Sequence, residues 1–154
     1  MPDGAVAIDC FICDKHALGD DVPGGVVYDD GLVYAGHTHP LDSDDAPLGY
    51  LMVEPRRHAT RLGDLTDEEA ARIGIVANRL SRALREVAGA EHVYSFVFGD
   101  RVPHLHLHLA PRYPGTPPEL FGLGAVNIQS STAVRRGGVA AIEFMCDQLR
   151  SAVS

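Results

Sequence analysis

The stretch VPHLHLHLAPRY, residues 102–113, alternates histidine and leucine over six consecutive positions. Successive side chains of a β-strand point to opposite faces, so a strand here gathers three imidazoles on one face and three leucines on the other. A helix would scatter the same side chains around its circumference. The pattern therefore predicts a strand that begins after Pro103, packs its leucines on a core and ends within PRYPGTPP, residues 111–118.

Composition limits the kind of protein this is. The 154 residues are 45% hydrophobic and 22% charged, as in an ordinary globular chain, and their number suits one domain over residues 1–154. The formal net charge of -8 argues against a nucleic acid partner, because such binding depends on Lys and Arg, but it allows a small phosphate-bearing substrate. Without a signal-peptide pattern or an apolar stretch of membrane-spanning length, we expect a cytoplasmic protein with no membrane partner.

Short β-rich runs dominate the rest of the first hundred residues. Val26–Tyr28 and Leu32–Ala35 are joined by DDG, residues 29–31, which is typical of a hairpin. Tyr50–Glu54 is expected as a third strand, and HVYSFVFGD, residues 92–100, as a fourth that pairs with the histidine strand. Because the strands come in runs instead of alternating with helices, the sequence predicts an α+β fold with an antiparallel sheet.

Two amphipathic helices are expected. Thr66 and Glu69 form a capping-box pattern that begins the first helix, and Gly89 ends it. Its apolar stripe, at spacings of three and four, consists of Ile73, Val76, Leu80, Leu84 and Val87. The second helix is expected in residues 137–153, with an inner face of Val139, Ile142, Met145 or Cys146, and Leu149.

The row of imidazoles and a cysteine pair are the candidate functional groups. Imidazoles that titrate near pH 7 serve as metal ligands, general acids or bases, or nucleophiles, and the spacing alone leaves these uses open. Cys10 and Cys13 could bind zinc or act as a redox pair. A redox pair would begin a helix, whereas strand-like and glycine-rich residues follow this one. His16 and His92 are expected to be solvated.

These segments together resemble the histidine triad (HIT) family, whose signature is His-x-His-x-His with apolar residues between. The resemblance runs from Cys10 to Tyr113 and leaves residues 114–154 as a C-terminal extension. It is carried by CFIC (10–13), VVYDDGLVYA (26–35), PRRHATRLGDLTDEE (55–69) and the triad followed by PRY. The resemblance implies a HIT-like antiparallel five-stranded sheet with one long helix, in a homodimer.

The resemblance also implies a chemistry. In it, His106 attacks the α-phosphorus of a nucleotide-type phosphoanhydride or phosphoramidate, and water hydrolyses the covalent phospho-histidine intermediate. His104 and His108 flank the nucleophile and hydrogen-bond to phosphate oxygens. His108, where the nucleotidyltransferase branch carries Gln, favours a hydrolase. Arg101 and Arg112, near the two ends of the strand, are candidates to bind phosphate.

A structural zinc ion is implied as well. CFIC resembles the cysteine pair of zinc-containing, bacterial-type members, in which the histidine of the PRRH segment and the first triad histidine complete the site. In this sequence the four ligands would be Cys10, Cys13, His58 and His104. Two thiolates and two imidazoles make a closed tetrahedral structural site.

The sequence also departs from the family pattern. VYAGHTHP, residues 33–40, lacks the acidic residue that holds the ribose, and GDRVP, residues 99–103, replaces the usual Gly-Gln-Ser type loop. Tyr50 stands where the family usually has a fourth histidine, for which His37 and His39 are candidate substitutes that would contact the substrate. We therefore keep three functions open: a hydrolase, a nucleotidyltransferase or phosphorylase, and a noncatalytic nucleotide-binding protein.

Overall fold

The structure, a computed structural model, describes residues 9–40 and 43–154. Its main sheet has five strands in the order β1, β2, β4, β6, β5, with antiparallel neighbours throughout. The strands are β1 (Val26–Asp29), β2 (Val33–His37), β4 (Leu51–Pro55), β5 (His92–Phe96) and β6 (Leu107–Arg112). A second sheet pairs β3 (Ala46–Pro47) with β7 (Arg136–Gly137). The predicted α+β fold with a five-stranded antiparallel sheet is confirmed.

Three α-helices surround the sheet: α1 (Phe11–Ala17), α2 (Asp67–Ala88) and α3 (Val139–Val153). Short 3-10 turns cover Gly19–Asp21, Leu62–Asp64, Pro118–Leu120 and Gly122–Asn127. No helix among residues 9–40 and 43–154 combines the length and the apolar character needed to cross a bilayer.

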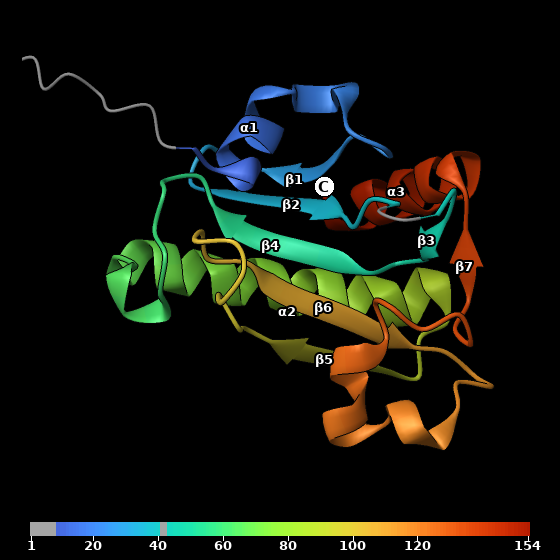
Figure 1. Cartoon of the computed structure of the whole chain (residues 1–154). Coiled ribbons are helices and arrows are strands. Elements are labelled where there is room, and N and C mark those ends of the chain that lie inside the picture. Colours follow the sequence, from blue (N-terminus) through green and yellow to red (C-terminus); the bar gives the residue numbers. More distant parts are fainter. Residues whose placement is uncertain (1–8, 41–42) are drawn as a thin grey trace, which may run out of the picture.

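Helices α2 and α3 cover one face of the sheet and form the main core with it (Figure 1). The leucines of the histidine segment point to this face, as their alternation predicts: Leu105 and Leu109 are buried, and Leu107 packs against the same cluster. Sheet side chains in this core include Val33, Ala35, Leu51 and Val53, and helix side chains include Ile73, Val76, Leu80, Leu84, Ile142 and Leu149. One face of the sheet is therefore covered by α2 and α3 and belongs to the hydrophobic core.

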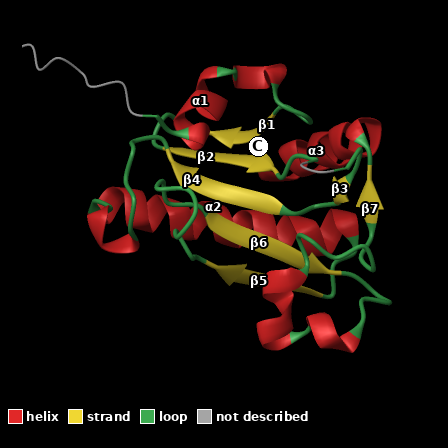
Figure 2. Cartoon of the chain, in the orientation of Figure 1, coloured by secondary structure: helices red, strands yellow, loops and turns green. Residues whose placement is uncertain are grey.

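The opposite face of the sheet lies between α1 and the C-terminal segment (Figure 2). Met52 of β4 pairs with His108 of β6, which pairs in turn with Phe96 of β5, so these side chains form a row across three strands. A smaller apolar cluster beside this row joins Tyr50, Ala110, Leu120, Ala125 and Ile128. The extension beyond residue 113 thus packs on both faces, through its 3-10 turns on one and α3 on the other.

Both predicted helix patterns are largely confirmed. The Thr66 hydroxyl accepts from the Glu69 backbone N–H at 3.1 Å, the Glu69 carboxylate accepts from the Thr66 N–H at 2.8 Å, and Gly89 ends α2 at φ 79°. The prediction that Val87 and Val139 belong to the buried faces of these helices is wrong, since their side chains are 39% and 48% exposed. Each lies in a terminal turn of its helix, where fewer neighbours cover a side chain.

The histidine strand is displaced from its predicted position. Strand β6 begins only at Leu107 and continues through Pro111 to Arg112. Pro111 is tolerated because the pairing with β4 stops at Leu109, so the last residues of β6 pair with β5 alone. Before the strand, the Leu105 N–H donates to the Ala59 carbonyl at 2.7 Å, which holds the first part of the triad in a loop.

The cysteine pair does begin a helix, contrary to the expectation of strand-like residues there. Cys10 is the N-cap of α1, and its sulfur accepts from the Cys13 backbone N–H at 3.4 Å. The helix is followed by a 3-10 turn and then by β1, at the edge of an antiparallel sheet. This arrangement differs from the strand-helix-strand unit of a thioredoxin-like redox site.

Candidate active site and metal cluster

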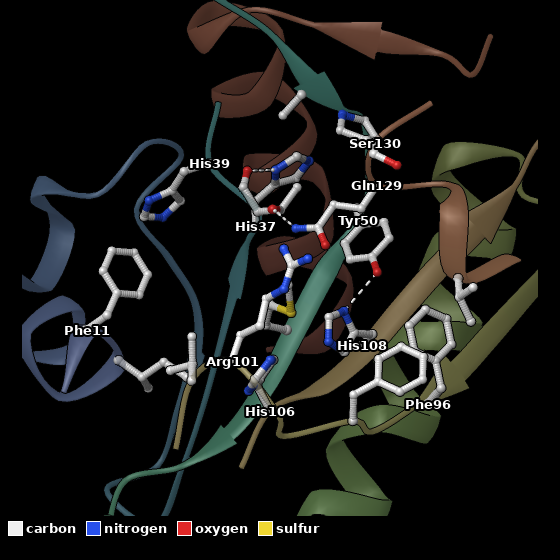
Figure 3. A pocket seen from close by; sticks show the side chains of 18 of the residues that line it. Phe11, His37, His39, Tyr50, Phe96, Arg101, His106, His108, Gln129 and Ser130 are labelled. Atoms are coloured by element: carbon white, nitrogen blue, oxygen red, sulfur yellow. Dashed lines mark hydrogen bonds between the residues drawn. The ribbon is translucent and has the colours of Figure 1, made fainter. Parts of the chain in front are cut away.

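A cavity of about 830 Å³ occupies the open face of the sheet. His106 and His108 line it together with Tyr50 and Phe96 (Figure 3), and Met52 is also part of the lining. Its walls come from α1 and the segment after β2 on one side and from the C-terminal extension on the other, including Phe11, Lys15, His39, Val126, Gln129 and Ser130. This volume lies in the range of small-molecule sites, and the two histidines give it reactive groups.

The ring of His106 is held by a backbone carbonyl. Its Nδ1 lies 2.7 Å from the carbonyl oxygen of His104. A carbonyl can only accept, so Nδ1 carries the proton and donates. In the neutral imidazole, Nε2 then keeps its lone pair, and the ring lines the cavity (Figure 3). The geometry therefore selects the tautomer whose Nε2 lone pair is available to a bound substrate.

The ring of His108 is fixed on two sides. Its Nδ1 lies 2.8 Å from the Tyr50 hydroxyl, and its plane stacks on Phe96 with centroids 4.9 Å apart and an angle of 19°. Burial, together with the nearby His106, lowers the pKa of His108 to about 4. This imidazole is therefore neutral near pH 7. The His106 ring lies beside it, with centroids 4.9 Å apart.

The His104 ring points away from the other two, toward the cysteines. Its Nδ1 lies 3.5 Å from both Cys10 Sγ and Cys13 Sγ, while His58 Nδ1 lies 3.5 Å from Cys13 Sγ. The four ligand atoms lie within 4.8 Å of one another. Bonds of about 2.3 Å to sulfur and 2.0–2.1 Å to nitrogen in a tetrahedral site put sulfur and nitrogen about 3.6 Å apart. These residues therefore could hold one metal ion.

The hydrogen bonds around the cluster favour metal binding by His104. His104 Nε2 donates to the Pro55 carbonyl at 2.8 Å, which leaves Nδ1 unprotonated toward the cysteines. Ligand histidines are typically oriented by such a second hydrogen bond. Burial, followed by the hydrogen bond with Cys10, raises the pKa of the Cys13 thiol to about 11. A bound cation would displace that proton, because its charge stabilises the thiolate.

The four predicted substrate contacts differ in where they lie. Arg101 and His39 line the cavity. His37 also lines it, but its Nδ1 donates to the Thr38 carbonyl at 2.7 Å and its Nε2 accepts from the Gly49 N–H at 2.8 Å. Burial lowers the pKa of His37 to about 4, so the ring is neutral near pH 7. It connects two backbone groups, the Thr38 carbonyl and the Gly49 N–H.

Arg112 lies outside the cavity lining. Its guanidinium sits 4.2 Å from the centroid of the Phe121 ring and donates to the Tyr94 hydroxyl at 2.8 Å. Its guanidinium therefore lies between Tyr94 of β5 and Phe121 of the C-terminal extension. Arg112 does not join Arg101 in the cavity lining, and its contact with phosphate stays a prediction.

A buried charge network beside the cavity was missed by the sequence analysis. Lys15 Nζ donates to Glu54 at 2.5 Å and His16 Nε2 donates to the other carboxylate oxygen at 2.7 Å, with Glu54 only 1% exposed. Burial acts to raise the pKa of Glu54, but the bonds from His16 and Lys15 outweigh it and hold the pKa below its usual value. The prediction that His16 is solvated is wrong, whereas His92 is exposed as expected.

Comparison with known proteins places the chain in a family. The HIT domain model matches residues 20–115. The chain belongs to the histidine triad family. An uncharacterised HIT-like protein of Borreliella burgdorferi is 30% identical over 112 residues, which are 68% of this chain and 76% of that one. An AP-4-A phosphorylase of Mycobacterium tuberculosis is 31% identical over 102 residues, 62% of this chain and half of the phosphorylase.

Solved structures of histidine triad proteins share the fold. A zinc-bound histidine triad family protein from Mycobacterium smegmatis superimposes with a TM-score of 0.66, over 94% of this chain and 93% of that one. The two sequences are 23% identical, so the likeness speaks for the fold alone. It extends beyond the matched domain to the C-terminal extension, because it covers nearly all of both chains.

Proposed function

We propose that this histidine triad protein cleaves a phosphoanhydride or phosphoramidate bond in a nucleotide-type substrate through a covalent intermediate on His106. The observation that carries the proposal is the bond from His106 Nδ1 to the His104 carbonyl, which places the proton of the neutral ring on Nδ1 and directs the other ring nitrogen, Nε2, to the cavity. A neutral imidazole is a competent nucleophile without a separate base. The family and its phosphorylase relative support a nucleotide-handling role.

The reaction would have two steps. The Nε2 lone pair of His106 attacks the α-phosphorus, the bond from phosphorus to the leaving group breaks, and its electron pair departs with the leaving group. Water then attacks the phospho-histidine, the phosphorus–nitrogen bond breaks, its electron pair returns to Nε2, and the proton of the water is released. The Nδ1–H bond to the carbonyl persists in both steps and stabilises the charge on the ring.

Other cavity residues would bind the phosphate. His108 can donate a hydrogen bond from the ring nitrogen that Tyr50 does not occupy, and Arg101 supplies positive charge. His39 is the remaining candidate contact on the α1 side. His104 acts through its carbonyl and not through its ring, so we assign it to positioning the nucleophile.

We further propose that the cluster of Cys10, Cys13, His58 and His104 binds a structural zinc ion. Support comes from the sulfur–nitrogen distances of 3.5 Å and the orientation of the His104 ring. Bound zinc would tie α1 to the loop before β6. None of the three cysteines forms a disulfide, which suits a reducing compartment, and we place the protein in the cytoplasm.

A phosphorylase is the second candidate, because an AP-4-A phosphorylase is 31% identical. Product analysis separates the two: diadenosine polyphosphates are incubated in ¹⁸O-water with and without inorganic phosphate. We expect ¹⁸O-labelled nucleoside monophosphate at a rate that does not depend on phosphate. Phosphate-dependent release of a nucleoside diphosphate would instead favour the phosphorylase.

We also propose a homodimer that pairs through the β5 edge of the sheet and α2. Strand β5 ends the five-strand order, and Phe98 just after it is exposed. Sedimentation velocity at micromolar concentration is expected to give about twice the 16.5 kDa chain mass. A single 16.5 kDa species at 100 μM, roughly a hundredfold above a micromolar dissociation constant, would contradict the dimer.

A further inference from the structure

Tyr50 faces the third histidine of the triad from the residue just before β4. Its side chain is buried, 1% exposed, and its hydroxyl lies 2.8 Å from His108 Nδ1 (Figure 3). The two rings meet edge to face, with centroids 5.8 Å apart. Tyr50 stands at the position where the resemblance to the family implies a histidine.

The hydrogen bond fixes which nitrogen of His108 carries the proton. Among the described residues, His108 Nδ1 is the one hydrogen-bond partner of the Tyr50 hydroxyl. Burial raises the pKa of Tyr50, so the phenol keeps its proton and donates it. Nδ1 therefore accepts, and the ring proton resides on Nε2.

The surroundings of His108 keep this ring uncharged. The groups around it are the Tyr50 hydroxyl, the rings of Phe96 and Phe98, the His106 ring and, in the paired position on β4, Met52. Glu54, on the same face, is already bonded to Lys15 and His16. No described carboxylate touches the His108 ring to stabilise an imidazolium.

From this geometry, and resting on the function proposed above, we propose that Tyr50 makes His108 a neutral hydrogen-bond donor and so selects phosphoanhydrides over phosphoramidates. Tyr50 is a positioning residue, because it acts on the substrate through His108. The substrate class follows from what a neutral Nε2–H can and cannot do for a leaving group.

The two leaving groups make different demands. When the phosphorus–oxygen bond of an anhydride breaks, the electron pair goes to a phosphate oxygen, which is stable as an anion and needs only a hydrogen bond from Nε2–H. When a phosphorus–nitrogen bond breaks, the electron pair goes to an amine nitrogen, which must gain a proton. His108 cannot give one readily, because losing Nε2–H while Tyr50 holds Nδ1 would leave an imidazolate.

The test compares two substrates on the full zinc-loaded chain. We measure kcat and KM for diadenosine triphosphate and for adenosine 5′-phosphoramidate, and for their guanosine counterparts, in the wild type and in Tyr50→Phe. Losing the phenol lets Nδ1 take the proton, so we expect kcat for the anhydride to fall about tenfold or more, with a smaller change in KM. The anhydride-to-amidate ratio of kcat/KM should fall by a similar factor.

Tyr113→Phe is the matched control. Tyr113 is also buried, and its hydroxyl donates to the Leu48 carbonyl at 2.7 Å, but it does not line the cavity. We expect this variant to leave the ratio unchanged. If the anhydride-to-amidate ratio of kcat/KM in Tyr50→Phe equals that of the wild type, the proposal that Tyr50 selects the substrate class is wrong. An equal fall of this ratio in Tyr113→Phe would also contradict it.

Nitrogen-15 NMR of the His108 ring gives a readout that is independent of turnover. The wild type should show an unprotonated Nδ1 and a protonated Nε2, and Tyr50→Phe a mixture of tautomers. A protonated Nδ1 in the wild type overturns the role of Tyr50. If neither substrate is turned over in a His106-dependent way, the proposed function fails instead, while the NMR result still decides the hydrogen bond.

Discussion

Replacing His106 with alanine is expected to lower kcat/KM by about four orders of magnitude or more, because the variant loses the atom that forms the covalent bond. The fold should survive. His106 is only partly buried, and the hydrogen bond from its ring to the His104 carbonyl contributes about 1 kcal/mol. Steady-state turnover and urea unfolding measure the two effects on one preparation.

Rapid quenching tests the same prediction directly. Mass spectrometry of the quenched wild type should find a nucleotidyl adduct on the peptide that holds His106, and none in His106→Ala. His92→Ala is the control, since His92 is exposed on β5 and does not line the cavity. Near-normal turnover by His106→Ala on every phosphoanhydride and phosphoramidate would contradict the proposed mechanism. Absence of turnover in the wild type would instead favour the noncatalytic binding protein.

The alternating stretch predicts the fold better than it predicts the site. Leu105 and Leu109 reach the core because period-two alternation needs only one buried face, whether or not the backbone is a regular strand. The same alternation also predicts three imidazoles on one face, whereas in the structure His106 and His108 line the cavity and His104 does not. His104 turns toward Cys10 and Cys13, the partners that the resemblance to the family implies for it. The alternation alone does not indicate this turn, because these cysteines lie about ninety residues earlier in the chain.

Long-range contacts explain the other differences as well. The cavity walls at Gln129 and Ser130 come from the extension, whose sequence carries no ligand-binding signal. His16 is buried because Glu54, 38 residues away, accepts from it. Tyr50 had a signal in the sequence, since it replaces a usual histidine, but its bond to His108 becomes evident only when β4 and β6 are paired.

The second large effect is expected on stability, from loss of the metal cluster. Cys13→Ala should lose bound zinc and at least about 3 kcal/mol of unfolding free energy, since a structural zinc ion contributes directly to folding. Cys146→Ala is the matched control, because Cys146 is a buried free thiol in the α3 core, apart from the cluster. It should lose stability through a small cavity but keep its zinc.

Loss of zinc should also lower the catalytic rate. The His104 ring belongs to the cluster, and its carbonyl holds the His106 Nδ1–H at 2.7 Å, so one residue links the metal to the nucleophile. Chelation is therefore expected to lower both the melting temperature and kcat, and zinc should restore the two together. Elemental analysis that finds no zinc in protein purified without chelator would remove the metal proposal. If zinc restores the melting temperature but not kcat, the proposed coupling through His104 is wrong, whereas the proposed zinc site is still supported.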